Sequence, residues 1–80
     1  MSGQSALTNG EATNHRGGNL GISAGVVQIT GGAISGGKGS YSAGKDIYIV
    51  NGKTTDSFTM SGVANSPSIF KQGTTGNVSY

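Results

Sequence analysis

The sequence predicts a small all-β domain. Gly, Ser, Thr and Asn make up just over half of its 80 residues, and only 32% are hydrophobic. The apolar residues gather into short β-branched clusters bounded by glycines, a pattern typical of strands and turns. No segment keeps the 3.6-residue period of an amphipathic helix, because glycines interrupt every window long enough to hold one. We therefore expect a glycine-rich domain of short strands and hairpins.

The first nineteen residues carry little structural signal. They are polar and aperiodic, with Leu7 and Ala12 as their only clear apolar anchors. We predict that residues 1–19 form an irregular, extended or flexible arm that packs on a neighbouring molecule. Residues 20–80 are predicted to form the β domain.

The first predicted strand covers residues 26–30, which are rich in β-branched side chains. The two-residue period of a strand places Val27 and Ile29 on one face. Gly31 and Gly32 follow and suit a two-residue hairpin turn into residues 33–35. Glycines and serines fill residues 36–44, so we expect a loop there.

The strongest local signal lies in residues 46–60. An apolar run ends at residue 50, and residues 53–60 alternate after Asn51 and Gly52. Asn-Gly between two such runs favours a type I′ hairpin turn, because both turn positions need a positive φ. We therefore predict a hairpin whose turn is Asn51-Gly52.

The alternation also assigns faces to this hairpin. Ile47 and Ile49 should share one face of the first strand, and Phe58 and Met60 should share one face of the second. Residues 61–68 hold the only proline and are expected to form a loop or edge. Short last strands are expected at residues 69–70 and 77–80.

Short phrases recur at a fixed interval along the chain. Ile22-Ser23-Ala24-Gly25 returns as Tyr41-Ser42-Ala43-Gly44, and Met60-Ser61-Gly62 is a weaker echo after a second, equal interval. The turn glycines Gly32, Gly52 and Gly73 follow one another at nearly the same interval. Three strand-and-turn units of about 20 residues fit either stacked solenoid rungs or successive hairpins, and the sequence leaves both open.

The chain offers little material for a core of its own. Small domains bury a low share of their surface, and glycine loses the most conformational freedom on folding. The chain has no cysteine to form a disulfide, and no Cys/His cluster suggests a structural metal. We therefore expect neighbouring subunits to complete the core, in an oligomer, a lattice or a filament.

The charges argue against nucleic acid as a partner. The net charge is +2, and the five basic residues are scattered rather than clustered. No apolar stretch has the length of a membrane helix, so membrane insertion is not expected. The first residues lack the features of a signal peptide, which predicts synthesis in the cytoplasm without export.

No motif indicates catalysis, a cofactor or a metal. Residues 32–38 match a phosphate-loop pattern, but a glycine follows the lysine and no helix is expected there. His15 is the only histidine, and Glu11, Asp46 and Asp56 are the only acids. A glycosidase needs two acids held at a defined separation and a calcium loop needs a dense group of acids, and the sequence indicates neither. We therefore predict that the protein is not an enzyme and has no cofactor.

Large apolar side chains are the best candidates for contacts between subunits, because aromatic residues bury much area at interfaces. The predicted interface residues are Leu7, Tyr41, Tyr48, Phe58, Phe70 and Tyr80.

These features predict a non-enzymatic structural protein that acts by self-assembly or by binding a protein lattice. A small virion component fits best, either a capsid decoration protein or a phage fibre or tail subunit. Its partners would be copies of itself and a capsid or filament protein. The alternative is an extracellular β-filament or adhesin-like subunit. A remote alternative is a glycan- or ice-binding module. The two threonine pairs at positions 54–55 and 74–75 bear on ice binding, which would use a regular array of threonines.

Overall fold

The structure is a computed structural model that describes residues 5–50, 52–73 and 75–80. This part of the chain consists of strands, turns and loops without a helix, which confirms the all-β prediction. The ten strands are β1 (Ala6–Thr8), β2 (Glu11–Ala12), β3 (Leu20–Ile22), β4 (Val26–Ile29), β5 (Ala33–Ser35), β6 (Lys38–Gly39), β7 (Ile47–Val50), β8 (Ser57–Met60), β9 (Ile69–Gln72) and β10 (Asn77–Ser79).

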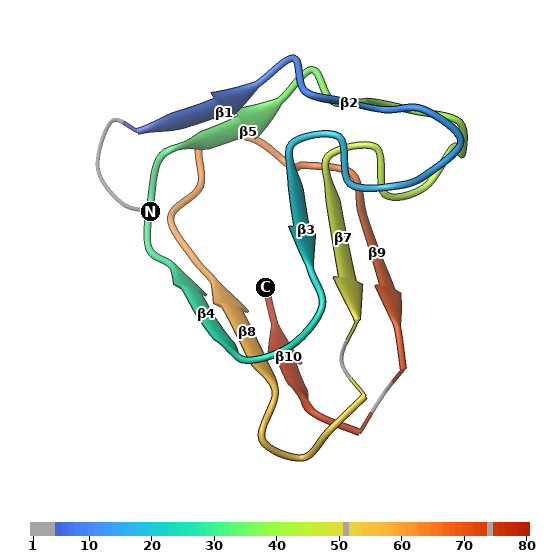
Figure 1. The fold of residues 1–80 in the computed structure, drawn as a ribbon. Helices are drawn as coiled ribbons and strands as arrows, with labels where there is room; N and C mark the ends of the chain where they lie inside the picture. Colours follow the sequence, from blue (N-terminus) through green and yellow to red (C-terminus); the bar gives the residue numbers. More distant parts are fainter. Residues whose placement is uncertain (1–4, 51, 74) are drawn as a thin grey trace.

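The strands pair in parallel around a common interior (Figure 1). One sheet has the order β3-β7-β9 and another the order β10-β8-β4, while β1 pairs with β5 and β2 with β6. The chain thus passes through the same set of sheets repeatedly. We call each passage a rung: the first holds β1–β4, the second β5–β8, and the third residues 61–80 with β9 and β10.

The offset between paired residues defines a parallel β-solenoid. Ala6 pairs with Ala33 and Leu20 pairs with Ile47, so the first and second rungs keep one offset at both places. The third rung is shorter, because Ile69 follows its partner Ile47 at a smaller offset. The Cα atoms span 31 × 31 × 15 Å, and the short dimension suits three layers of strands about 4.8 Å apart.

The predicted hairpins are wrong. β7 and β8, which should form the Asn51-Gly52 hairpin, each pair in parallel with other rungs and not with each other. Gly31-Gly32 likewise connects β4 to β5, two strands of different sheets. A preferred turn sequence acts only locally, whereas here each strand finds its partner one rung away. Asn51 itself lies outside the described residues.

Two other expectations also need correction. The N-terminal segment is not an irregular arm from residue 6 onward, because β1 and β2 pair with β5 and β6 of the next rung. The recurring Ser-Ala-Gly phrase is not the structural repeat either. Residues 23–25 follow β3, whereas residues 42–44 follow β6, so the two copies occupy different corners of the solenoid.

The core is formed by ladders of inward-facing side chains from successive rungs. The predicted faces of β7 are confirmed, since Ile47 and Ile49 are buried while Tyr48 and Val50 are only half-buried. The buried residues are Ile22, Ile29, Ile34, Ile47, Ile49 and Phe58. Four of these are less than 2% exposed, and all four belong to the second rung, which is covered on both sides.

Candidate assembly surfaces at the ends of the stack

The two ends of the solenoid present strands that are paired on one side. In the two three-stranded sheets, β7 and β8 are central, and β3 and β4 lie at one end. β9 and β10 lie at the other end (Figure 1). Within the described residues, no strand pairs with the outer edges of these four strands. Such edges present unpaired N–H and C=O groups in the spacing that another strand would match.

The core is also incomplete at these ends. In one ladder, Ile47 is fully buried, while its first-rung partner Leu20 and its third-rung partner Ile69 are half-buried. In a second ladder, Phe58 is 1% exposed, while its partners Val27 and Val78 are half-buried. In these two ladders, the side chain that is covered by a rung on each side is the most buried one. The rule is not general, because Ile29 of the first rung is 3% exposed while its second-rung partner Met60 is half-buried.

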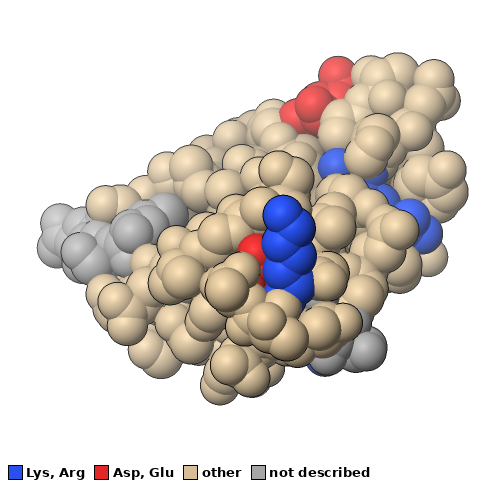
Figure 2. All heavy atoms as spheres, turned by 60° about the horizontal axis from the view of Figure 1, so that its bottom comes forward, with Lys and Arg blue, Asp and Glu red and all other residues tan. Residues whose placement is uncertain are grey.

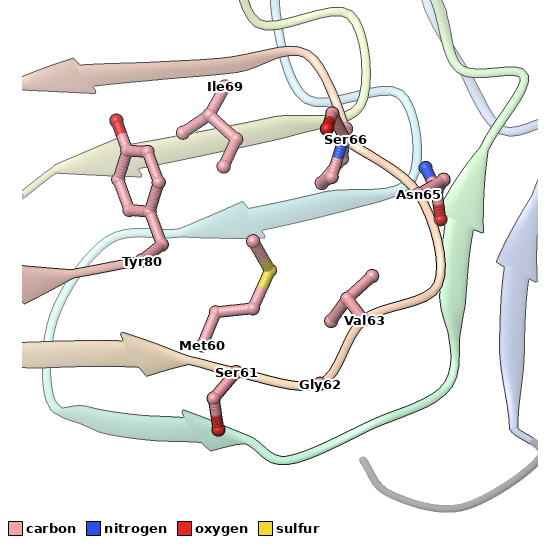
Figure 3. A pocket seen from close by; sticks show the side chains of 9 residues that line it. Met60, Ser61, Gly62, Val63, Asn65, Ser66, Ile69 and Tyr80 are labelled. Carbon is pink, nitrogen blue, oxygen red and sulfur yellow. The ribbon is translucent and has the colours of Figure 1, made fainter.

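A cavity of about 530 Å³ opens at the third rung. Apolar side chains from different parts of the chain project into it: Met60 from the end of β8, Val63 from the following segment, Ile69 from β9, and Tyr80 (Figure 3). Ser61, Gly62, Asn65, Ser66 and Pro67 complete the lining. The cavity is thus the solenoid interior at the point where no further rung fills it within the described chain.

Asn65 closes part of the same end. Its Oδ1 accepts a hydrogen bond from the backbone N–H of Ile34 at 3.0 Å, and its Nδ2 donates to the carbonyl oxygen of Ile34. The side-chain amide thereby makes the two bonds that a third strand would make with β5. Beside it, the Ala64 N–H donates to the Gly32 carbonyl oxygen at 2.9 Å.

Lys71 interrupts the apolar ladder at the third rung. Ile22, Ile49 and Lys71 occupy one register position of the β3-β7-β9 sheet. Ile22 and Ile49 are buried, whereas Lys71 is exposed. A charged residue at a position that is apolar in the other rungs disfavours unrestricted pairing at a sheet edge. Lys71 should therefore weaken association at the third-rung end, which the apolar cavity favours.

Asp46 is a buried structural acid. It is only 7% exposed, and its Oδ1 accepts hydrogen bonds from Asn19 Nδ2 at 2.9 Å and from the Gly37 N–H at 2.8 Å. Its Oδ2 accepts the Ser68 N–H at 2.8 Å. Asn19, Asp46 and Ser68 come from successive rungs, so this carboxylate ties all three layers together.

Asp56 holds the corner before β8. The Gly25 N–H donates to its Oδ1 at 2.9 Å, and the Lys53 N–H donates to its Oδ2 at 3.0 Å. The bond from Gly25 is the main reason that the pKa of Asp56 lies below its usual value. Burial opposes this shift, while the Lys53 N–H and its charge reinforce it. Nothing in the sequence pattern pointed to these bonds between both acids and the backbone.

The predicted interface residues lie in three places. Leu7 is half-buried on β1 and packs against the core, and Phe58 is a core residue at 1% exposure. Tyr80 is 61% exposed, lines the end cavity and meets Phe58 edge to face at 6.4 Å. The remaining three, Tyr41, Tyr48 and Phe70, gather around Arg16 on the outer surface. Gly52 lies in the connection between β7 and β8.

The structure brings few charged groups together. Among the described residues, no three His, Cys, Asp or Glu side chains lie close enough to hold a metal ion. Nor does this part of the chain contain a helix that is long and apolar enough to cross a membrane. Figure 2 shows lysine and arginine side chains at separate places on one face, without a continuous basic surface.

No family model, curated protein or solved structure matches this chain. The function is therefore inferred from the fold and from the chemistry of its surfaces.

The sequence did not indicate the residues that shape the open end. Met60, Val63 and Ile69 are ordinary apolar residues, and only the solenoid topology brings them to one cavity. For Asn65, the sequence predicts only a loop or edge. For Asp46, the sequence does carry a signal of its place in the stack: Asn19 and Asp46 are both polar, both precede an apolar strand, and are separated by the same offset as Leu20 and Ile47.

Proposed function

We propose that the chain is a non-enzymatic structural subunit whose stack of parallel strands is extended by other copies of the same chain. The observation that supports this most is the contrast between the rungs. In two ladders, the second rung, covered on both sides, buries Ile47 and Phe58 almost completely, whereas their partners in the outer rungs are half-buried, namely Leu20, Ile69, Val27 and Val78.

Extension from end to end would remove that difference. A first rung of one copy seated on the third rung of another would place Leu20 over Ile69 and Val27 over Val78, continuing the ladders seen within the chain. It would also fill the apolar cavity beside Tyr80 and pair the outer edges of β9 and β10. Burial of apolar surface contributes about 25 cal/mol of stabilising free energy per Å². Stacking would therefore add stability to a chain whose own core is small.

A one-dimensional stack favours a fibre over a flat lattice. Within the virion setting that the sequence suggested, we therefore propose a phage fibre or tail subunit ahead of a capsid decoration protein. An extracellular β-filament or adhesin-like subunit would use the same stacking and remains the alternative. For the ice-binding alternative, one threonine of the later pair, Thr74, lies outside the described residues.

The experiment is the mass of the protein in solution across concentration, measured by light scattering behind a sizing column. Wild type is compared with Ile69→Lys, which places a charge at the open end, and with Thr54→Lys, which places the same charge on the second rung. Thr54 is exposed and lies in the connection between β7 and β8, away from the end strands, so it is a matched control.

We expect mass to rise with concentration in the wild type and in Thr54→Lys, and to stay at the monomer value in Ile69→Lys. Circular dichroism on each peak verifies that all three keep their strands. A wild type that remains a folded monomer at every concentration would contradict the proposal.

A further inference from the structure

The structure holds a second feature, on the outer surface, to which Phe70 of the end strand β9 contributes. Arg16 lies between two aromatic rings: its Cζ is 4.1 Å from the ring centroid of Tyr41 and 3.9 Å from that of Phe70. Tyr48 stacks against Phe70 at 6.0 Å, and His15 meets Tyr48 edge to face at 5.6 Å. All three rungs thus contribute to one cluster around a single guanidinium.

The backbone makes room for this arrangement at Gly44. A Cβ there would lie 2.6 Å from the Cβ of Phe70 and 3.2 Å from Cδ of Arg16. Its φ of +76° is also in the left-handed region, which side chains disfavour. Gly44 therefore lets the arginine reach its place beside the rings.

The guanidinium has a donor that is not used within the described residues. Its Nε is shielded from solvent and has no hydrogen-bond partner among the described residues. The guanidinium carbon lies close to the centroids of both rings, and the N–H donors of the group all lie in its own plane. Carboxylate and phosphate oxygens both match such an edge, and a carboxylate does so as a planar group with two oxygens.

The surroundings of Arg16 suit a small polar ligand. Asn14, His15, Arg16, Tyr41 and Tyr48 line a cavity of about 180 Å³. The backbone N–H of Arg16 donates to His15 Nδ1 at 3.0 Å. In a neutral His15 the ring proton is then on Nε2, where it can act as a donor. Tyr41 is 47% exposed and offers an aromatic surface at the rim.

We propose that this cluster, the Arg16 site, binds an acidic sugar, a sugar ring that carries a carboxylate. The carboxylate would pair with Arg16, the hydroxyl groups would meet His15 and Asn14, and the C–H face of the sugar would lie on Tyr41. A phosphate would fit less well, since its second charge would face only one lining cation. The glycan-binding alternative from the sequence thereby gains a specific site, which is independent of assembly at the ends.

The test uses the full chain and nuclear magnetic resonance. An oligogalacturonate is titrated into the protein, and the uncharged galactose oligomer of equal length is titrated separately, while the Arg16 Nε–H signal is followed. We expect the oligogalacturonate to shift this signal and to bind at least about tenfold more tightly than the neutral oligomer.

Two variants test the role of the guanidinium. Arg16→Lys keeps the charge but not the planar fork, and should weaken binding about tenfold. Lys53→Gln removes one positive charge at a residue that does not line the site and should leave binding within about twofold. The wild-type titration remains decisive if Arg16→Lys folds poorly.

Three results would overturn the proposal. The first is that the Arg16 signal does not move at saturating oligogalacturonate. The second is that the two variants lose equal affinity, which would mean attraction by net charge only. The third is that acetate or a glutamate-containing peptide binds as tightly as the oligogalacturonate, which would remove the sugar from the assignment.

Discussion

Truncation of one ladder at each of its three levels tests the solenoid and its open ends together. Leu20, Ile47 and Ile69 occupy one register position in the first, second and third rungs. Ile47 is fully buried, with a ladder neighbour on both sides, whereas the other two have a neighbour on one side and are half-buried. The three alanine variants therefore remove comparable side chains from unequal environments.

The expected magnitudes follow from burial. Ile47→Ala should cost about 2–5 kcal/mol, because deleting a fully buried aliphatic side chain leaves a cavity. Leu20→Ala and Ile69→Ala should cost about 1–2 kcal/mol in the monomer, since only part of each side chain is removed from water. A domain of 80 residues has a total stability of about 4–12 kcal/mol, so the central change is severe.

The assay is urea unfolding of dilute, monomeric protein, followed by circular dichroism. Repeating it at a concentration where copies associate should raise the cost of the two end truncations toward that of Ile47→Ala, because stacking would bury those side chains. Equal costs for all three variants in the monomer would refute the reasoning, since rung coverage would then not determine burial.

Three further predictions concern single residues. Asp56→Asn should make stability less sensitive to acid, because the lowered pKa of Asp56 stabilises the fold above the ordinary aspartate value of about 4 and this contribution is lost as pH falls through the lowered pKa. Unfolding curves of both proteins across acidic pH check this, and an equal loss of stability in both would contradict it. Asn65→Ala should cost about 1–3 kcal/mol, because it leaves the backbone groups of Ile34 without their partner, as measured by urea unfolding. Lys71→Ile should promote association by restoring an apolar ladder, so light scattering should give a higher mass than for wild type, and an unchanged mass would count against stacking at this end.

The faces of the strands could be predicted from sequence, but their partners could not. The alternation at Ile47 and Ile49 is a local property of an extended chain, and the structure confirms it. Pairing depends on contacts between residues far apart in the chain, since Ser57 pairs with Asn77 on one side and with Val26 on the other. The Asn51-Gly52 signal was local, and the stacking of whole rungs overrode it.

A weak trace of the true repeat is present in the turn residues. Gly17 and Gly44 are related by the same offset as Leu20 and Ile47, both have positive φ, and the Gly17 N–H donates to the Gly44 carbonyl oxygen. Asn9 and Gly36 are another pair at this offset with positive φ. These pairs differ in residue type or in their neighbours, so the more visible Ser-Ala-Gly phrase concealed them.

The two candidate surfaces differ in how far the sequence foretold them. Composition and the absence of disulfides predicted a core in need of neighbours, and this stays a prediction. The Arg16 site could not be predicted, because Arg16, Tyr41 and Phe70 come from different rungs and meet only through a stacking order that the local patterns do not specify.

Disulfide trapping tests end-to-end extension most directly. The chain has no cysteine, and Val26, Ser57 and Asn77 occupy one register position of the β4-β8-β10 sheet. Within one chain, Val26 and Asn77 are separated by two strand spacings, about 9.6 Å, which is too far for a disulfide. In stacked copies, Val26 of one copy would lie beside Asn77 of the next.

The measurement is mild oxidation of the Val26→Cys, Asn77→Cys double variant, followed by gel electrophoresis without reductant. The account predicts a ladder of cross-linked multimers. The Val26→Cys, Ser57→Cys control should give a monomer closed by an internal disulfide, because its two sites are direct neighbours. A double variant that stays monomeric, while the control closes its disulfide, would contradict extension of the stack by other copies.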